Sequence, residues 1–255
     1  VPKAVIEEIL EVAKRAPSSM NTQPWDVHVV TGEPLEEVRR RNMEEMIAGA
    51  KPKRDIISHG EYQGVHRQRQ VDIAKKLFGA MGIARDDKPM RQDWVLRGFR
   101  QFDAPVSLVL TYDRVLDPGA VCHFDLGALC YGIVLAAWDR GLGSVINGQG
   151  IMRSDIVREV AKIPEDEVIM TCVAMGYPDD GFAANAVRSD REANSDFVRF
   201  VGFAEQCTRA RMCRRHGIVP MSVAMPPARG RRADLIWIKC TDAIGIMSPR
   251  NDATP

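Results

Sequence analysis

The segment from Phe124 to Trp138 constrains the fold more than any other part of the sequence, because it is apolar on nearly every side. A helix without a polar face, in a protein that lives in water, has to be buried on all sides. Its small residues, among them Gly127, Ala128 and Gly132, allow neighbouring backbones to approach closely. We therefore expect a central helix, shared across the interface of a homodimer. Gly141 is expected to end it in the left-handed conformation.

The remaining hydrophobic periodicity predicts an α+β fold, in which a mixed, mostly antiparallel sheet is flanked by helices. Apolar residues recur with helical spacing from residue 3 to 15, and Pro17 ends that helix. The other expected helices cover 33–46, 71–81 and 154–161, the last with Ser154 as its N-cap. The expected strands are 27–31, 106–111, 145–146 and 168–175. Residues 49–64 are expected to form an exposed connection.

Composition narrows the class of protein. The chain has 255 residues, of which 45% are hydrophobic and 27% charged, and its net charge is +1. This balance predicts neither a nucleic-acid partner nor attraction to an acidic membrane. We see no run of about 18 apolar residues and no signal peptide at the start, so we expect neither a membrane span nor secretion. Cys130 and Cys172 lie in apolar runs and are expected to be buried thiols of a cytoplasmic protein.

A change in composition near Phe203 predicts a boundary between a main domain, residues 1–203, and a tail, residues 204–255. The tail holds nine basic and four acidic residues. It is expected to be a solvated basic extension. A weaker alternative is an arm that binds an anionic polymer, and a third is an artefact of the sequence. Cys207, Cys213 and His216 have the spacing of no common zinc finger, so no metal is expected.

Most catalytic signatures are absent. The sequence has no Walker A loop, no HExxH and no GxSxG, and Gly141-Leu-Gly143 follows a helix and lacks the third glycine of a dinucleotide fingerprint. One segment is rich in hydrogen-bonding groups, the loop from Pro17 to Gln23 with its three hydroxyls and two amides. Such a loop suits a polar ligand, but its composition alone equally fits an ordinary turn.

The same loop carries a resemblance to a known family. Residues 16–25, Ala-Pro-Ser-Ser-Met-Asn-Thr-Gln-Pro-Trp, resemble the A-P-S-x-x-N-x-Q-P-W loop of the FMN-dependent nitroreductases, in particular the actinobacterial type. Three further pieces follow in the family's order: the helix from Asp125 with its G-L-G exit, Ile163-Pro164 leading to Gly176-Tyr177-Pro178, and the aromatic segment 197–203. The resemblance covers residues 1–203 and implies a three-layer fold.

The resemblance also implies an activity and a set of binding residues. Family members hold FMN at a homodimer interface and transfer hydride from NADH or NADPH to a small nitroaromatic or quinone-like acceptor by a ping-pong mechanism. The flavin carries the chemistry, so no catalytic side chain is expected. By position in the motifs, the residues implied in FMN binding are Pro17, Ser18, Ser19, Asn21 and Gln23 in the loop, Asn147, Gly148, Gln149 and Gly150 beside the flavin ring, and Arg188 and Arg191 at the phosphate.

Two departures from the family leave alternatives open. Family members carry an Arg-Arg-Ser-x-Arg segment before the first helix, whereas this sequence begins at Val1-Pro2-Lys3. If 1–255 is the whole chain, FMN is expected to bind weakly, and a flavin-free binding protein is the alternative. The expected lid, 61–97, matches no subfamily motif. Another flavin reduction, such as enone reduction, dehalogenation or flavin destruction, is therefore the second alternative.

Overall fold

The computed structural model describes residues 1–56, 60–117 and 119–203. Val1–Val187 belong to one compact unit, and Arg188 opens a second; each is considered by itself. The second contains the short helix α7 (Asn194–Phe197) and an edge-to-face pair of rings, Phe200 and Phe203. The boundary at residue 203 stays a prediction, and the basic tail with Cys207, Cys213 and His216 lies outside the described residues.

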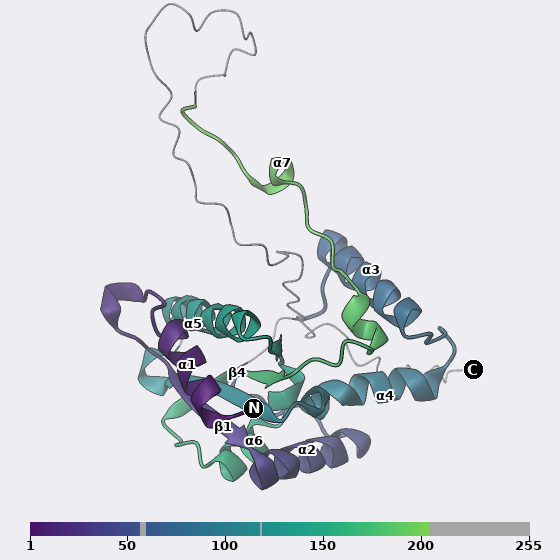
Figure 1. Ribbon diagram of the computed structural model, residues 1–255, viewed down its shortest axis with the longest axis horizontal. Helices are drawn as coiled ribbons and strands as arrows, with labels where there is room; N and C mark the ends of the chain where they lie inside the picture. Colours follow the sequence, from purple (N-terminus) through teal and green to yellow (C-terminus); the bar gives the residue numbers. More distant parts are fainter. Residues whose placement is uncertain (57–59, 118, 204–255) are drawn as a thin grey trace, which may run out of the picture. The chain divides into compact units, whose positions relative to one another are not determined.

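A four-stranded sheet forms the centre of the first unit, with the strand order β1-β2-β4-β3 (Figure 1). Its strands are β1 (Asp26–Thr31), β2 (Val106–Asp113), β3 (Gly143–Ile146) and β4 (Glu167–Gly176). All three ladders are antiparallel, and the β2–β4 ladder is irregular between Leu110 and Thr111. The two central strands are continuous apolar runs and are buried on both faces, as the sequence predicts.

Helices cover both faces of this sheet, which confirms the three-layer arrangement. Leu108 and Leu110 of β2 belong to a core shared with α1 (Lys3–Ala13) and α5 (Ala120–Asp139). Val109, between them, belongs to a second core shared with α2 (Gly32–Ile47) and α6 (Ser154–Ala161). The alternation follows from the twofold period of a strand, which sends successive side chains to opposite faces.

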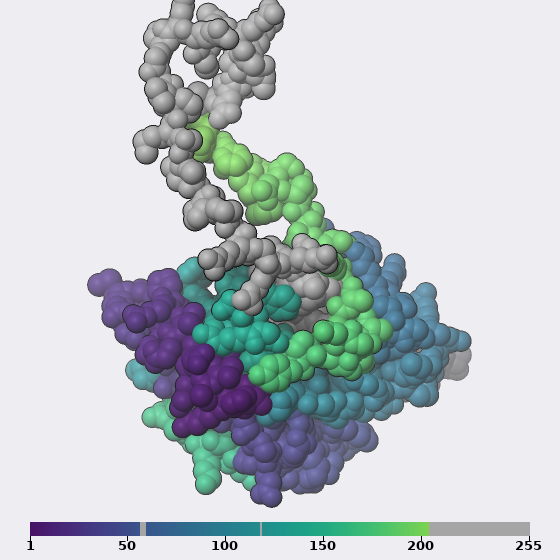
Figure 2. Space-filling model, in the orientation of Figure 1, coloured from purple at the N-terminus to yellow at the C-terminus, as the bar shows by residue number. Residues whose placement is uncertain are grey.

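The central helix α5 is only half enclosed by its own chain. One side packs on α1 and the sheet, while five large apolar residues on the other side are 37–80% exposed: Val121, Phe124, Tyr131, Leu135 and Trp138. A single chain therefore leaves one side of α5 uncovered, and the expectation that a second copy covers it stays a prediction. Gly141 ends the helix with φ of +74°, as predicted. Figure 2 shows α5, in teal, reaching the surface beside the purple N-terminal segment.

The helix α5 bears on the expectation that no segment crosses a membrane. Among the described residues it is the one helix long and apolar enough, by length and composition. Half of its most apolar stretch is buried inside the chain. It packs on α1 and shares a core with the sheet, as the core helix of a soluble protein does.

The region between β1 and β2 is more helical than the sequence indicates. Helix α3 spans Gly64–Ala80, so it begins seven residues before the predicted start at Val71. Helix α4 (Lys88–Phe99) was not predicted, because its apolar residues keep no regular spacing; Asp87 caps it by accepting a hydrogen bond from Met90 N. Trp94 of α4 and Ile83 form a third small core, in which the ring of Trp94 stacks on Phe182.

The start of α6 differs from the prediction as well. The N-cap position is held by Arg153, and the hydroxyl of Ser154 donates a hydrogen bond back to Ile151 O at 3.0 Å. Ser154 is completely buried, so this bond satisfies a hydroxyl that has no access to water. The N-cap assignment fails because a buried carbonyl competes for the side chain.

Candidate functional site

The loop Pro17–Gln23 connects α1 to β1 and is mostly exposed. Of its motif residues Pro17, Ser19, Asn21 and Gln23 are exposed, and Ser18 is half-buried. The Ser18 hydroxyl accepts a hydrogen bond from Gln23 N at 2.9 Å, which closes the loop on itself. The side-chain amide of Asn21 makes no hydrogen bond within the described part of the chain, so it remains available to a ligand.

The backbone of this loop is strained. Met20, Asn21 and Gln23 have φ values of 50°, 59° and 48°, in the left-handed region that residues with a Cβ seldom adopt. Met20 is 93% exposed, so burial of its side chain does not compensate for that conformation. Strain of this kind persists where the surroundings impose it, and it is concentrated at ligand sites.

A buried carboxylate anchors the loop to the central helix. Asp125 is 4% exposed, and its Oδ2 accepts a hydrogen bond from Ser19 N at 2.9 Å. The loop therefore lies beside α5. The sequence offered a signal for this role that we did not use: Asp125 is an acid inside an otherwise apolar run.

The turn Asn147–Gly150 follows β3, and its backbone has few unused polar groups. Asn147 N donates to Cys172 O at 2.8 Å, and Gln149 N donates to the side-chain oxygen of Asn147 at 3.0 Å. Gly148 is buried, yet no described residue accepts a hydrogen bond from its N–H. Because a buried N–H nearly always has a hydrogen-bond partner, the N–H of Gly148 is a candidate donor to a bound ligand.

Contacts with four other segments hold the turn in place. Asn42 of α2 donates to Gly150 O at 3.0 Å, and Arg54 donates to Gly148 O at 3.0 Å. The amide of Asn147 donates to Gly98 O of α4 at 2.8 Å. From β4, the thiol of Cys172 contacts Asn147 O at 3.1 Å. The side chain of Asn147 is thus completely buried, and both ends of its amide form hydrogen bonds within the protein.

Close packing fixes the same turn sterically. A Cβ on Gly150 would lie 2.7 Å from Cys172 Sγ and 3.0 Å from the side chains of Asn147 and Gln101. Gln101 begins a second left-handed turn, with φ of 55° to 57° over Gln101–Asp103. We did not predict this strained turn, Arg54 or Asn42, because no local pattern places them near residues 147–150.

The two predicted phosphate-binding arginines belong to the second unit. Arg188 and Arg191 are both exposed. The guanidinium of Arg191 donates to Ser189 Oγ at 2.7 Å and to Asp190 O at 2.8 Å. The two arginines therefore stay a prediction for the phosphate, separate from the loop and the turn, which belong to the first unit.

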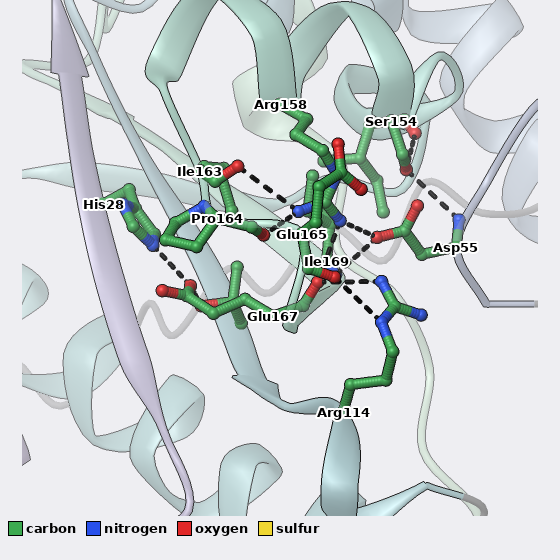
Figure 3. A network of polar contacts seen from close by, with 12 residues as sticks. His28, Asp55, Arg114, Ser154, Arg158, Ile163, Pro164, Glu165, Glu167 and Ile169 are labelled. Carbon is green, nitrogen blue, oxygen red and sulfur yellow. Dashed lines mark hydrogen bonds and ion pairs between the residues drawn. The ribbon is translucent and has the colours of Figure 1, made fainter.

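The remaining polar cluster has a structural role (Figure 3). Arg158 of α6 forms a buried ion pair with Asp55 and donates to Glu167 O at 2.9 Å. His28 contacts the carboxylate of Glu167 at 2.6 Å, and His123 contacts the hydroxyl of Tyr112 at 3.0 Å. Both histidines thus have neighbouring side chains as partners. Within the described ranges no cluster of His, Cys, Asp or Glu could hold a metal ion.

Comparison with known proteins shows which family the chain belongs to. The model of the nitroreductase family matches residues 1–177, a span that includes the loop and the turn. The chain belongs to the nitroreductase family. This confirms the resemblance drawn from the A-P-S-x-x-N-x-Q-P-W motif, although the matched range ends before Arg188 and Arg191.

Named relatives and solved structures agree with the family. A chloronitrobenzene nitroreductase of Comamonas testosteroni is 33% identical over 205 residues, which cover 79% of this chain and 88% of the relative. Nitroreductase NfnB of Mycolicibacterium smegmatis is 30% identical, over 78% of this chain and 84% of the relative. The crystal structure of the FMN-dependent nitroreductase NfnB from Mycobacterium smegmatis in complex with NADPH superimposes with a TM-score of 0.73 at 29% identity, covering 79% of this chain and 89% of that one.

Proposed function

We propose that this protein is an FMN-dependent NAD(P)H oxidoreductase that reduces small nitroaromatic or quinone-like compounds. The observation that carries the proposal is the buried N–H of Gly148, which no described residue accepts, in a turn held rigid from four sides. Family membership and the names of the relatives support the same conclusion. FMN, when bound, would supply the hydride and electron transfer between NADH or NADPH and the acceptor.

The residues present fit a flavin mononucleotide. An isoalloxazine ring has nitrogen and oxygen acceptors along its edge, which match the N–H of Gly148 and the amides of Asn21 and Gln23. The hydroxyls of Ser18 and Ser19 suit the ribityl chain. A guanidinium suits a phosphate because its planar fork of donors matches two phosphate oxygens, and we assign that role to Arg188 and Arg191.

This chain's own residues would bind, orient and shield the cofactor. Gly148 offers an N–H at a fixed place because Cys172 Sγ contacts the carbonyl of the same peptide, Asn147 O, and because the next peptide, Gly148–Gln149, is restrained at both ends. The amide of Asn21 offers a second set of donors and acceptors on a loop whose conformation is set before binding. A preformed site of this kind avoids the entropic cost of ordering groups when the ligand arrives.

A homodimer completes the proposal. In α5 the exposed residues at positions 121, 124, 127, 131, 135 and 138 lie three or four apart, along one face of the helix. This is the spacing of a seam along which one helix packs against another. A second copy of α5 would cover the seam, and would bring the Asp125-anchored loop to the subunit interface. Phe124→Glu tests this: sedimentation should show the wild type as a dimer and the variant as a folded monomer.

The experiment that tests the function begins with flavin binding. Purified protein is titrated with FMN, and then assayed for NADPH or NADH oxidation with nitrobenzene as acceptor. Flavin absorbance bound in an equimolar ratio together with turnover supports the proposal. Absence of flavin binding favours the flavin-free alternative, and flavin binding with turnover only of enones or halogenated phenols favours another reduction on the same scaffold.

We also propose that the protein is cytoplasmic and has no nucleic-acid or membrane partners.

Riboflavin, which lacks the phosphate, tests the two arginines separately. If Arg188 and Arg191 bind the phosphate, the double variant Arg188→Ala/Arg191→Ala should lose the wild-type preference for FMN over riboflavin. An unchanged preference would assign the phosphate to other groups. Arg199→Ala is the matched control, since Arg199 is an exposed arginine near them to which no role in FMN binding is assigned.

A further inference from the structure

Arg54 is the arginine that contacts the proposed flavin-binding turn. Its Nη2 donates to Gly148 O at 3.0 Å, and its Nε contacts Met152 Sδ at 3.3 Å. Two of its five N–H donors are thus engaged. The side chain is half-buried, so water screens its charge only in part.

The backbone around Arg54 is fixed on both sides. Lys53 pairs with the chain at residues 152–154, donating to Met152 O at 2.9 Å and accepting from Ser154 N at 3.0 Å. Asp55, on the other side, forms the buried ion pair with Arg158 and accepts from Ile169 N at 3.0 Å (Figure 3). The guanidinium of Arg54 is therefore held near the turn by the fold itself.

The charge of Arg54 is uncompensated, in contrast to most arginines of the first unit. Among the described residues no carboxylate pairs with Arg54. Seven other buried or half-buried arginines do have carboxylate partners, and an eighth, Arg91, lies over the ring of Phe78 instead. The seven are Arg39, Arg41, Arg97, Arg100, Arg140, Arg153 and Arg158. A half-buried cation without a counter-charge is costly unless a ligand uses its charge.

We propose that Arg54 tunes the bound flavin: it positions the Gly148–Gln149 peptide, and its uncompensated charge stabilises the reduced cofactor. This inference rests on the proposed function. The reduced flavin carries more negative charge than the oxidised form, so a nearby fixed cation favours reduction. The role is that of a positioning residue, because Arg54 acts through the turn and through its field.

The test measures the midpoint potential of FMN bound to the full chain in three variants. Arg54→Met keeps the length of the side chain and removes its charge, whereas Arg54→Lys keeps the charge. Arg41→Met is the matched control, since Arg41 pairs with Glu159 and does not contact the turn. We expect Arg54→Met to weaken binding of reduced FMN at least tenfold relative to oxidised FMN, a fall of about 30 mV for two electrons. Arg54→Lys and Arg41→Met should change that ratio less than twofold.

Hydrogen exchange of the cofactor-free protein separates positioning from folding. In Arg54→Met the amide of Gln149 should exchange faster, while the amides of the central strands keep their protection. If the exchange changes and both redox forms of FMN lose affinity equally, Arg54 is merely structural and the inference falls. An unchanged potential in Arg54→Met also overturns it. A wild-type chain that binds no FMN overturns the proposed function, and the inference with it.

Discussion

The loop Pro17–Gln23 and the turn Asn147–Gly150 are both proposed to contact one ligand, yet the protein holds them in opposite ways. The loop is exposed, strained in three of its residues, and joined to the rest of the chain by one bond to Asp125. The turn is largely buried and receives bonds or close contacts from α2, α4, β4 and the segment around Arg54.

This difference teaches where the effect of a substitution should appear. A residue of the turn shares its hydrogen bonds with the core, so its loss should lower the free energy of unfolding. A residue of the loop has water as an alternative partner, so its loss should lower ligand affinity and leave stability nearly unchanged. The predictions below test that division, beginning with the largest expected effect.

The sharpest comparison uses one amide from each region. Asn147→Ala removes the side-chain donor to Gly98 O and the side-chain acceptor of Gln149 N, so we expect the free energy of unfolding to fall by about 3 kcal/mol. Asn21→Gly removes an exposed amide and retains a residue that tolerates φ of 59°, so stability should change by less than about 0.5 kcal/mol. Urea denaturation measures both, and equal losses in the two variants would refute the division.

A pH titration tests the ion pair between Arg153 and Asp155, which follows the turn in the chain. The hydrogen bond from Arg153 lowers the pKa of Asp155 from 3.8 to about 2, and Lys53 contributes to the same effect while partial burial opposes it. Because the pKa is lower in the folded state, this stabilisation is present above about pH 4 and is lost as the pH falls toward 2. It amounts to about 2 kcal/mol.

Asp155→Asn should therefore cost about 2 kcal/mol at pH 7 and progressively less toward pH 2, measured as unfolding free energy against pH. Glu159→Gln is a control from the same helix, because Glu159 is exposed and pairs only with Arg41 among the described residues. If the Asp155→Asn and wild-type curves stay parallel between pH 2 and 5, Asp155 is not the group that titrates.

Asp125 tests the anchor of the loop. Asp125→Asn keeps the shape of the side chain but exchanges a charged acceptor for a neutral one, which weakens the bond to Ser19 N by about 1.5 kcal/mol. We expect FMN affinity to fall by about tenfold, with the same circular dichroism spectrum as the wild type. Full retention of affinity would show that the strained backbone holds the loop without this bond.

The smallest effect is expected at Ser18. Ser18→Ala removes the acceptor of the Gln23 N–H as well as a hydroxyl proposed to face the ligand, so FMN affinity should fall by about 1 kcal/mol, or roughly fivefold. Thr22→Ala removes a neighbouring exposed hydroxyl outside the motif and is the control. Calorimetric titration that finds the same affinity in both variants would remove Ser18 from the site.

Local pattern was sufficient for the elements with strong periodicity. The continuous apolar runs of β2 and β4, the helix α1 and the left-handed Gly141 follow from burial, spacing and the freedom of glycine, and each was predicted close to its observed bounds. The motif around Ser18 and Asn21 indicated the family because its residues are contiguous in the sequence. Helix α4 was missed, since its residues form no apolar stripe.

What the sequence determined by itself is thus the set of strongly patterned elements, the α+β class and the family. The tertiary structure alone decided how the site is supported. Arg54 and Gly148 are 94 residues apart, and Ser19 and Asp125 are 106 apart. The open face of α5 likewise appeared only once the rest of the chain had been packed. Such contacts depend on the folding of the whole chain and on burial, because a hydrogen bond between distant residues leaves no period or spacing in the sequence.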